Sequence, residues 1–148
     1  MNSSWNFRIQ EIMLVDDDVI VRTVATKILK SIDFNGTIST FENGQLAIDE
    51  IQRRFCREKS IPGGDRTLLL LDINMPILDA WGFLDKYSSL DQKIKSHFYV
   101  VIITSSIDSN DRLRAFSYPD VHDYINKPLS GEHVTDFLNR HHLLEMES

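Results

Sequence analysis

Apolar runs alternate with helical patterns along the whole chain, as is typical of repeated strand and helix units around a parallel sheet. Three apolar runs are continuous, at residues 12–15, 68–71 and 98–103. Continuous runs favour strands covered by helices on both faces, because strands with one wet face alternate apolar and polar residues. The pattern predicts five strands, at about Glu11–Asp16, Thr37–Phe41, Thr67–Asp72, Phe98–Thr104 and His122–Ile125.

Between the strands, apolar residues recur at helical spacing. The clearest case follows the first strand, where Val21, Val24 and Ile28 share one helix face behind an N-cap at Asp18. This helix is expected to end at about Ser31. Four further helices are predicted, at about Gln45–Arg57, Trp81–Leu90, Ser109–Ser117 and Gly131–His142. The order of elements therefore indicates an α/β fold with five strands and five helices.

Length and composition indicate one globular domain over residues 1–148, with 42% apolar and 26% charged residues. The one long polar interruption, residues 57–66, carries Pro62-Gly63-Gly64 and is predicted to be an extended surface loop. The chain ends soon after its last predicted helix, so no appended module is expected. Its single cysteine, Cys56, cannot form an intramolecular disulfide, which favours a reducing, cytoplasmic setting.

The charge balance excludes several classes of function. Acidic residues outnumber basic ones by 22 to 16, giving a net charge of −6, the opposite of a surface that binds the phosphate backbone. No apolar run approaches the roughly 18 residues that span a bilayer. We therefore expect no direct nucleic-acid binding and no membrane insertion.

Polar residues gather where the predicted strands end. The first strand runs into Asp16, Asp17 and Asp18, the third ends at Asp72, and later strand ends carry Thr104-Ser105-Ser106 and Asn126-Lys127-Pro128. The carboxyl ends of parallel strands share one edge of a sheet, so these side chains should meet there. Two carboxylates about 5 Å apart repel by roughly 3 kcal/mol, so a group of three must take up a proton or bind a metal. Oxygen ligands favour Mg²⁺, and with Lys127 the site would suit phosphoryl transfer to a carboxylate.

Four segments carry a resemblance to a known family. They are LVDDDVIVR (Leu14–Arg22), LLLDINMPILDAWGFL (Leu69–Leu84), VVIITSS (Val100–Ser106) and DYINKPLSG (Asp123–Gly131). In their order and spacing they resemble the receiver domain of two-component response regulators, the CheY-like family, over about residues 10–142. The resemblance implies a flavodoxin-like, doubly wound sheet with strand order 2-1-3-4-5.

The resemblance also implies roles for individual residues. Asp72 matches the phospho-acceptor, which takes a phosphoryl group from a histidine kinase or histidine phosphotransfer protein. Asp17, Asp72 and the backbone carbonyl of Asn74 match the direct Mg²⁺ ligands, while Asp16 matches a residue that acts mainly through water. Lys127 matches the lysine that pairs with the phosphoryl group, and its bond to Pro128 is expected to be cis.

Two more positions match the family's switch. Thr104 corresponds to the hydroxyl that turns toward the phosphoryl group, and Tyr124 to the aromatic ring that moves inward behind it. Asn74 and Ser106 match positions that tune loss of the phosphoryl group. The downstream contact surface is expected at about Ser109–Arg140. Such a protein catalyses its own phosphorylation and dephosphorylation without being a conventional enzyme.

The sequence departs from the family's pattern at two places, and two alternative functions stay open. Ala80 stands where the family has Gly, and if that glycine takes a positive φ, Ala80 must strain or reshape the loop. The connection before the third strand is also longer than usual. One alternative is a pseudo-receiver that binds partners without phosphorylation. Another is a phosphatase of the haloacid-dehalogenase type, against which Asn74 counts, because that reaction needs an aspartate there as general acid and base.

Overall fold

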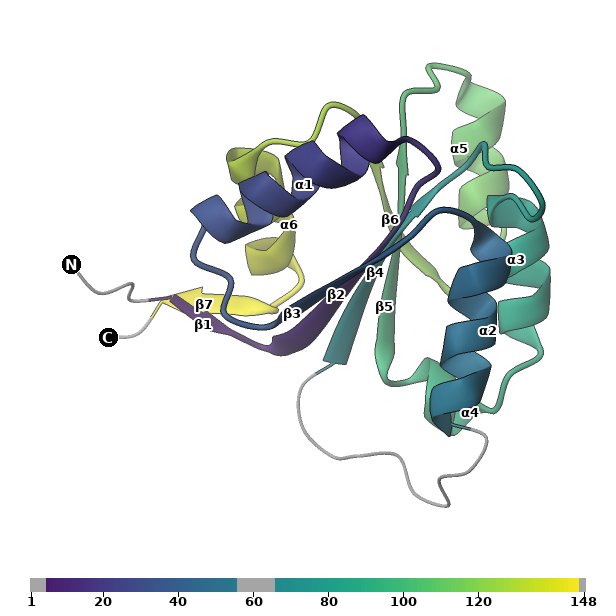
Figure 1. Ribbon diagram of the computed structural model, residues 1–148, viewed down its shortest axis with the longest axis horizontal. Coiled ribbons are helices and arrows are strands. Elements are labelled where there is room, and N and C mark those ends of the chain that lie inside the picture. The colour runs from purple at the N-terminus through teal and green to yellow at the C-terminus, as the bar shows by residue number, and fades with distance from the viewer. Residues whose placement is uncertain (1–4, 56–65, 147–148) are drawn as a thin grey trace.

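A five-stranded parallel sheet forms the centre of the molecule (Figure 1). The computed structural model describes residues 5–55 and 66–146. The strands stand in the order β3-β2-β4-β5-β6, which is the expected order 2-1-3-4-5 of the five main strands. Their bounds are Thr37–Phe41 for β3, Ile9–Val15 for β2, Arg66–Asp72 for β4, Phe98–Thr104 for β5 and Val121–Asn126 for β6. All five predicted strands and the doubly wound α/β class are confirmed.

The helices cover both faces of the sheet. They are α1 (Val19–Ser31), α2 (Gly44–Phe55), α3 (Ala80–Ser88), α4 (Gln92–Lys95), α5 (Ser109–Phe116) and α6 (Gly131–Arg140). The expected count of five is wrong, because the described residues contain a sixth helix, α4. A four-residue helix is too short to leave a periodic apolar pattern, and it begins behind its own N-cap at Asp91 after α3 has ended.

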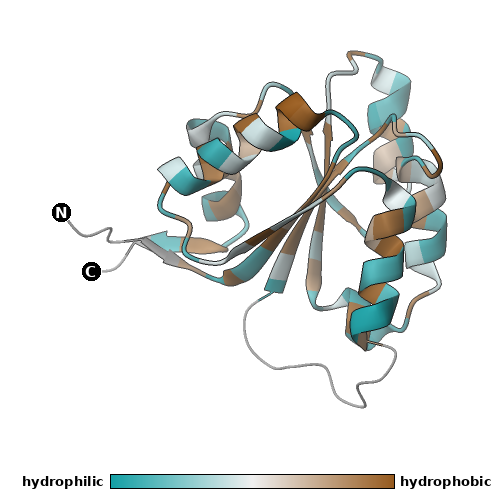
Figure 2. Cartoon of the chain, viewed as in Figure 1, coloured by the Kyte–Doolittle hydropathy of each residue, from teal (hydrophilic) through white to brown (hydrophobic). Residues whose placement is uncertain are grey.

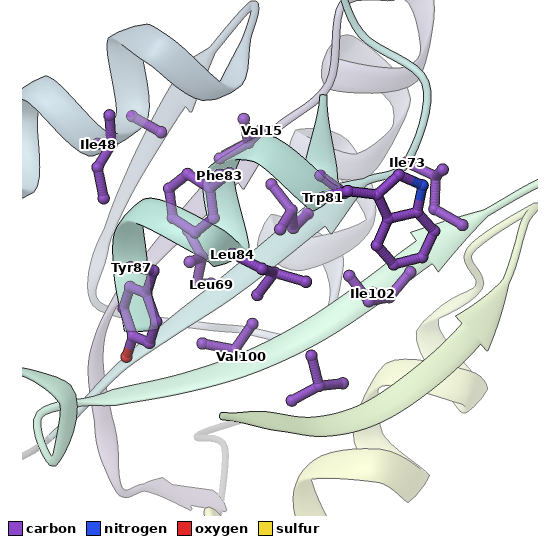
Figure 3. Close-up of a cluster of buried hydrophobic side chains, with 14 of the residues drawn as sticks. Val15, Ile48, Leu69, Ile73, Trp81, Phe83, Leu84, Tyr87, Val100 and Ile102 are labelled. Carbon is purple, nitrogen blue, oxygen red and sulfur yellow. The ribbon is translucent and has the colours of Figure 1, made fainter. Parts of the chain in front are cut away.

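Two apolar cores explain the continuous runs in the sequence. α1 and α6 pack on one face of the sheet, and α2, α3 and α5 on the other (Figure 1). Along β4, Leu68 and Leu70 belong to the first core, whereas Leu69 and Leu71 belong to the second. Figure 3 shows the second core, where Phe83, Leu84 and Tyr87 of α3 lie against strand residues Leu69, Val100 and Ile102. The central strands β2, β4 and β5 thus need apolar residues at successive positions.

Colouring by hydropathy shows the same division. The central strands are largely hydrophobic, while the helices carry both hydrophobic and hydrophilic residues (Figure 2). Within the two described segments, no helix combines the length and the hydropathy that crossing a membrane requires. The loop expected at residues 57–66 lies outside the described residues, apart from Arg66, which begins β4, and Cys56 lies outside them too.

A small antiparallel ribbon was not predicted. β1 (Trp5–Phe7) pairs with β7 (Leu144–Met146), so the fold extends beyond the expected core of residues 10–142. Phe7 packs edge-on against Phe34, with 5.3 Å between ring centroids, and Leu144 is buried. Strands of three residues give too few positions for an alternating pattern, which is why the sequence did not indicate the ribbon.

Candidate functional site

Three carboxylates meet at the carboxyl edge of the sheet, as the sequence predicted. Asp16 and Asp17 follow β2, and Asp72 is the last residue of β4. β2 and β4 are neighbours, with Val15 paired to Leu71, so their ends lie side by side. One oxygen from each of the three carboxylates lies within 4.8 Å of the other two. Asp16 and Asp72 are buried, and Asp17 is exposed.

Lys127 reaches into this cluster from the end of β6. Its Nζ donates to Asp16 Oδ2 at 2.6 Å and to Asp72 Oδ1 at 3.3 Å. The backbone N–H of Lys127 donates to the carbonyl of Thr104 at 2.7 Å, which sets the lysine against the end of β5. The expected cis bond between Lys127 and Pro128 is present. Two of the three carboxylates, Asp16 and Asp72, therefore share one ammonium group.

The excess of negative charge shifts the pKa values of Asp72 and Lys127. Burial, together with the nearby charge of Asp16, raises the pKa of Asp72 to about 6, although Lys127 opposes this. Burial disfavours the ammonium of Lys127, but its bonds to Asp16 and Asp72 outweigh that effect and hold its pKa above the usual value. A cation placed among the carboxylates would relieve the repulsion. A set of carboxylate oxygens at one rim matches the ligands that Mg²⁺ prefers, so the residues present fit that ion.

The three aspartates that follow β2 have different roles. Asp18 accepts a hydrogen bond from the Ile20 N–H at 2.8 Å and caps α1, which is the structural role expected for it. Asp16 Oδ1 accepts from the Asp18 N–H at 2.9 Å, and Arg22 donates to the Asp16 carbonyl at 2.6 Å. These bonds fix the direction of the Asp16 side chain and leave Asp17 on the exposed rim of the cluster.

The two expected switch residues lie beside the site. Thr104 ends β5, is almost fully buried, and its Oγ1 accepts from the Ser106 N–H at 3.0 Å. Tyr124 of β6 is turned inward, 7% exposed, with its ring 6.3 Å from that of Phe116. Among the described residues, no hydrogen bond of good geometry reaches the buried Tyr124 hydroxyl, although the side chain of Ser106 is close enough to lower its pKa. Burial raises the pKa of this phenol.

The loop after Asp72 departs from expectation. Ala80 begins α3 without a positive φ, and its N–H donates to the carbonyl of Ile73 at 3.0 Å, so the strain expected at Ala80 is absent. The left-handed residue is instead Ile77, with φ of 69° and a side chain that is 81% exposed. A β-branched residue is strained in that conformation, so the loop after Asp72 holds its strain three residues before Ala80. Asn74 lies exposed in the same loop.

Sequence reasoning missed two residues next to this site. Asp111 accepts a hydrogen bond from Ser106, and Arg112 lies 5.5 Å from the centre of the Tyr124 ring. Neither belongs to a strand end, which is where the chemistry was sought. Their place in the first turn of a helix after the Thr104 strand was the available signal.

Comparison with known proteins now identifies the family. Residues 12–139 match the model of the response regulator receiver domain. The chain belongs to this family. A response regulator receiver protein from Dyadobacter fermentans has 25% sequence identity and a TM-score of 0.74, with 88% of this chain and 95% of that chain covered. A two-component response regulator from Cytophaga hutchinsonii has 26% identity and a TM-score of 0.72, over 89% and 96% of the two chains.

Longer proteins contain a similar receiver domain. Protein-glutamate methylesterase/protein-glutamine glutaminase 1 of Paramagnetospirillum magneticum is 29% identical over 119 residues, which is 80% of this chain and 28% of that protein. This receiver domain thus spans little more than a quarter of that relative. The matched range includes every residue of the acidic cluster, Lys127 and both switch residues, whereas the β1–β7 ribbon lies outside it.

Proposed function

We propose that this receiver domain is a phosphorylation-activated switch of a two-component phosphorelay. Asp72 is the acceptor, and the donor is a phosphohistidine of a histidine kinase or a histidine phosphotransfer protein. The observation that carries the proposal is the cluster of Asp16, Asp17 and Asp72 at the carboxyl edge of the sheet, with the Lys127 ammonium bonded to Asp16 and Asp72. A site with surplus negative charge around a buried carboxylate is suited to binding a cation and then a phosphoryl group.

Asp17, Asp72 and the backbone carbonyl of Asn74 would hold Mg²⁺, with Asp16 acting mainly through water. The ion supplies positive charge that offsets the charge on the transferring phosphoryl oxygens. Asp16 is fully buried and already bonded to Lys127, which supports its indirect role. Asp17 is exposed and therefore accessible to a hydrated ion.

In the proposed transfer, an Asp72 carboxylate oxygen attacks phosphorus while the bond from phosphorus to the histidine nitrogen breaks. The products are an acyl phosphate and a neutral histidine. Lys127 lies 3.3 Å from Asp72 Oδ1 and is placed to pair with an oxygen of the transferred group. Hydrolysis of the acyl phosphate, also at this site, would return the switch to its resting state.

The output follows from the added charge. A phosphoryl group adds about −1.5 to −2 charges and three acceptor oxygens at pH 7. Thr104 and Tyr124 would respond first, and the surface at about Ser109–Arg140 would then change its protein contacts. The protein acts on its own side chain, so it is a switch and not a conventional enzyme. We place this function in the cytoplasm, where two-component kinases present their phosphohistidine.

The test is the intact mass of the protein after incubation with acetyl phosphate, with and without Mg²⁺. We expect a Mg²⁺-dependent gain of one phosphoryl group that Asp72→Asn loses. The matched control is Asp136→Asn, which changes an exposed carboxylate on α6 and should leave the gain intact. Uptake that persists in Asp72→Asn would place the acceptor elsewhere. No adduct, with no binding of beryllofluoride, would instead favour a binding module that works without phosphorylation.

A further inference from the structure

The two edges of the central sheet differ in how well they are protected. The strand order places β3 at one edge and β6 at the other. On β6, the pairing register shifts between Val100 and Val101, which leaves His122 as the extra residue of a bulge. The next residue, Asp123, is charged and lies 3.0 Å from His141 Nε2. Bulges and charged residues both hinder an edge strand from pairing with another chain.

The β3 edge lacks these protections. Its five residues, TISTF, include no charged residue, no proline and no glycine. Its pairing with β2 runs from Thr37 to Phe41 without a register shift, and Thr37 and Thr40 are exposed. A regular edge strand of β-branched and aromatic residues is a template to which a further strand can add.

The outward backbone groups of β3 belong to Ile38 and Thr40. The Asp16 N–H donates to the carbonyl of Phe41 at 3.0 Å, so the backbone groups of Phe41 face the β2 side. Backbone direction alternates along a strand, and those of Ile38 and Thr40 therefore face away from the sheet. In the described part of the chain, these outward groups form no hydrogen bond. An added strand would supply their partners.

A hollow of about 490 Å³ adjoins this edge. Arg22 of α1 lines it from one face of the sheet, Leu46 and Asp49 of α2 line it from the other, and Thr40 and Phe41 lie between them. Figure 1 shows β3 between these two helices. The hollow thus follows the strand edge itself, and a strand added to β3 would place a side chain in it.

The carboxylates of the hollow favour a cation. Glu42, Asp49 and Glu50 all line it. Glu50 already pairs with Arg53 at 2.7 Å. Asp49 accepts from the neutral Gln45 amide at 2.8 Å, and neither Glu42 nor Asp49 forms an ion pair with another described residue. Two carboxylates are therefore available to an incoming positive charge.

The rest of the wall suits the stem of a basic side chain. Leu46 is 45% exposed, and Phe41 is half-buried beside it. Lysine and arginine lay their methylene stems along such apolar surface while the charged end reaches a polar group. Arg22 does not neutralise the two carboxylates by pairing with them, because it donates to the Asp16 carbonyl at 2.6 Å.

We propose that the β3 edge site binds an extended segment of a partner protein that carries a lysine or an arginine. The β3 edge site is the outward backbone of Ile38 and Thr40 together with the hollow. Backbone pairing supplies affinity, and the basic side chain supplies specificity. A second copy of this chain fits less well, since its own β3 carries no cation and two chains of net charge −6 repel each other. The site does not include Asp72 and is independent of phosphoryl transfer.

The experiment titrates the full chain with a capped peptide of alternating threonine and valine with a central lysine, and follows the amide NMR signals. We expect saturable changes centred on Ile38 and Thr40, with slower hydrogen exchange at both amides. A peptide with glutamate in place of the lysine should bind several-fold more weakly. The lysine peptide methylated on alternate backbone nitrogens should not bind, because it cannot pair with a strand.

Variants of the protein test the two parts of the site separately. Glu42→Gln combined with Asp49→Asn should weaken binding of the lysine peptide several-fold and bring it close to that of the glutamate peptide. Asp136→Asn, an exposed carboxylate on α6, is the matched control and should leave binding unchanged. Thr40→Pro removes an outward N–H, at an edge position where proline is tolerated, and should abolish binding.

Three results would overturn the proposal. One is the absence of saturable changes at Ile38 and Thr40. Another is equal binding of the lysine, glutamate and methylated peptides, which would mean that contact with the chain is unspecific. The third is a concentration-dependent dimer of the wild type that Thr40→Pro abolishes, which would make a second copy the occupant. Loss of phosphoryl uptake at Asp72 would overturn the proposed function and leave this site untouched.

Discussion

Two ionic clusters lie at opposite ends of β2 and contain the same kinds of groups in different proportions. At the carboxyl end, Asp16, Asp17 and Asp72 lie together, and the ammonium of Lys127 pairs with Asp16 and Asp72. Toward the amino end, buried Glu11 accepts from Arg54 Nη2 at 3.0 Å.

The cluster at Glu11 has further partners that complete its charge balance. Arg54 also donates to Glu50 at 2.7 Å, and Arg53 pairs with Glu50 at the same distance. Ser39 adds a hydrogen bond to Glu11 at 2.6 Å. Among the described residues, this cluster contains two carboxylates and two guanidinium groups, whereas the other contains three carboxylates and one ammonium.

The difference in proportion reverses the pKa shifts. Hydrogen bonds from Arg53 and Arg54 hold the pKa of Glu50 down at about 2, and the bond to Glu11 raises the pKa of Arg54. At the other end, burial and Asp16 raise the pKa of Asp72 to about 6. A balanced cluster keeps its charges and contributes to stability. An unbalanced one holds repelling carboxylates, and protonation or a bound cation relieves the repulsion. Surplus charge, and not the number of acidic residues, therefore marks the functional site.

The largest effect on stability is expected from a substitution that breaks the balanced cluster at Glu11. Glu11→Gln should lower the free energy of unfolding by about 2 kcal/mol, because it leaves the partly buried Arg54 guanidinium without its main charged partner. Phosphoryl uptake at Asp72 should not change. Urea denaturation checks the loss, with Glu145→Gln as the control, since its exposed pair with Arg8 should contribute less than about 1 kcal/mol. Equal losses in the two variants would contradict the comparison.

A smaller effect of opposite sign is expected at the unbalanced cluster. Asp72→Asn should raise the free energy of unfolding by about 1 kcal/mol at pH 7 without Mg²⁺, because it removes one of the mutually repelling carboxylates. Mg²⁺ should stabilise the wild type and have much less effect on the variant. The measurement is the denaturation midpoint with and without the ion. Destabilisation of the Mg²⁺-free protein by Asp72→Asn would show that the carboxylate is held by favourable contacts.

The smallest effect concerns pH and involves His97, which lies close enough to the Glu11 cluster for Glu11 and Arg54 to act on its pKa. His97 is buried and its Nε2 lies 3.0 Å from Thr67 Oγ1, and burial lowers its pKa below the usual 6.5. The unfolded chain therefore binds a proton at a pH where the folded chain does not, so the stability from neutral His97 is complete above about pH 6.5 and falls as pH drops below it.

His97→Gln should therefore reduce the loss of stability between pH 7.5 and 5.5 by up to about 1 kcal/mol. The comparison belongs in an Asp72→Asn background, because the raised pKa of Asp72 gives a slope of the opposite sign in the same range. Some slope should remain, since burial also lowers the pKa of His122. If the pH dependence of the free energy of unfolding were unchanged in His97→Gln, folding would not alter the pKa of His97.

The sequence predicted the structure best where the fold requires residues of one kind at successive or neighbouring positions. Leu68 to Leu71 are all apolar because alternate residues face different cores, and this requirement made β4 recognisable. The acidic cluster was predictable because parallel strands deliver their ends to one edge. The β1–β7 ribbon and α4 were missed because three or four residues define no period.

Other features depend on conformation that residue types do not determine. Strain at Ala80 or a reshaped loop was expected. Ala80 starts α3 without a positive φ, and the left-handed residue of this loop is Ile77. The hydrogen bonds that Ser106 makes to Asp108 and Asp111 depend on the direction of one hydroxyl, which spacing along the chain does not specify. Packing and hydrogen bonding had to be seen in three dimensions to find these contacts.

The ribbon decides where anything joined to this receiver domain would emerge. β1 leads directly into the amino end of β2, and β7 lies beside β1, so both ends of the described chain leave from one place (Figure 1). The acidic cluster lies at the other end of β2, a strand of seven residues that spans about 23 Å. A module fused to either end of the described chain would thus be tethered away from the cluster, leaving the approach of the proposed phosphoryl donor unobstructed.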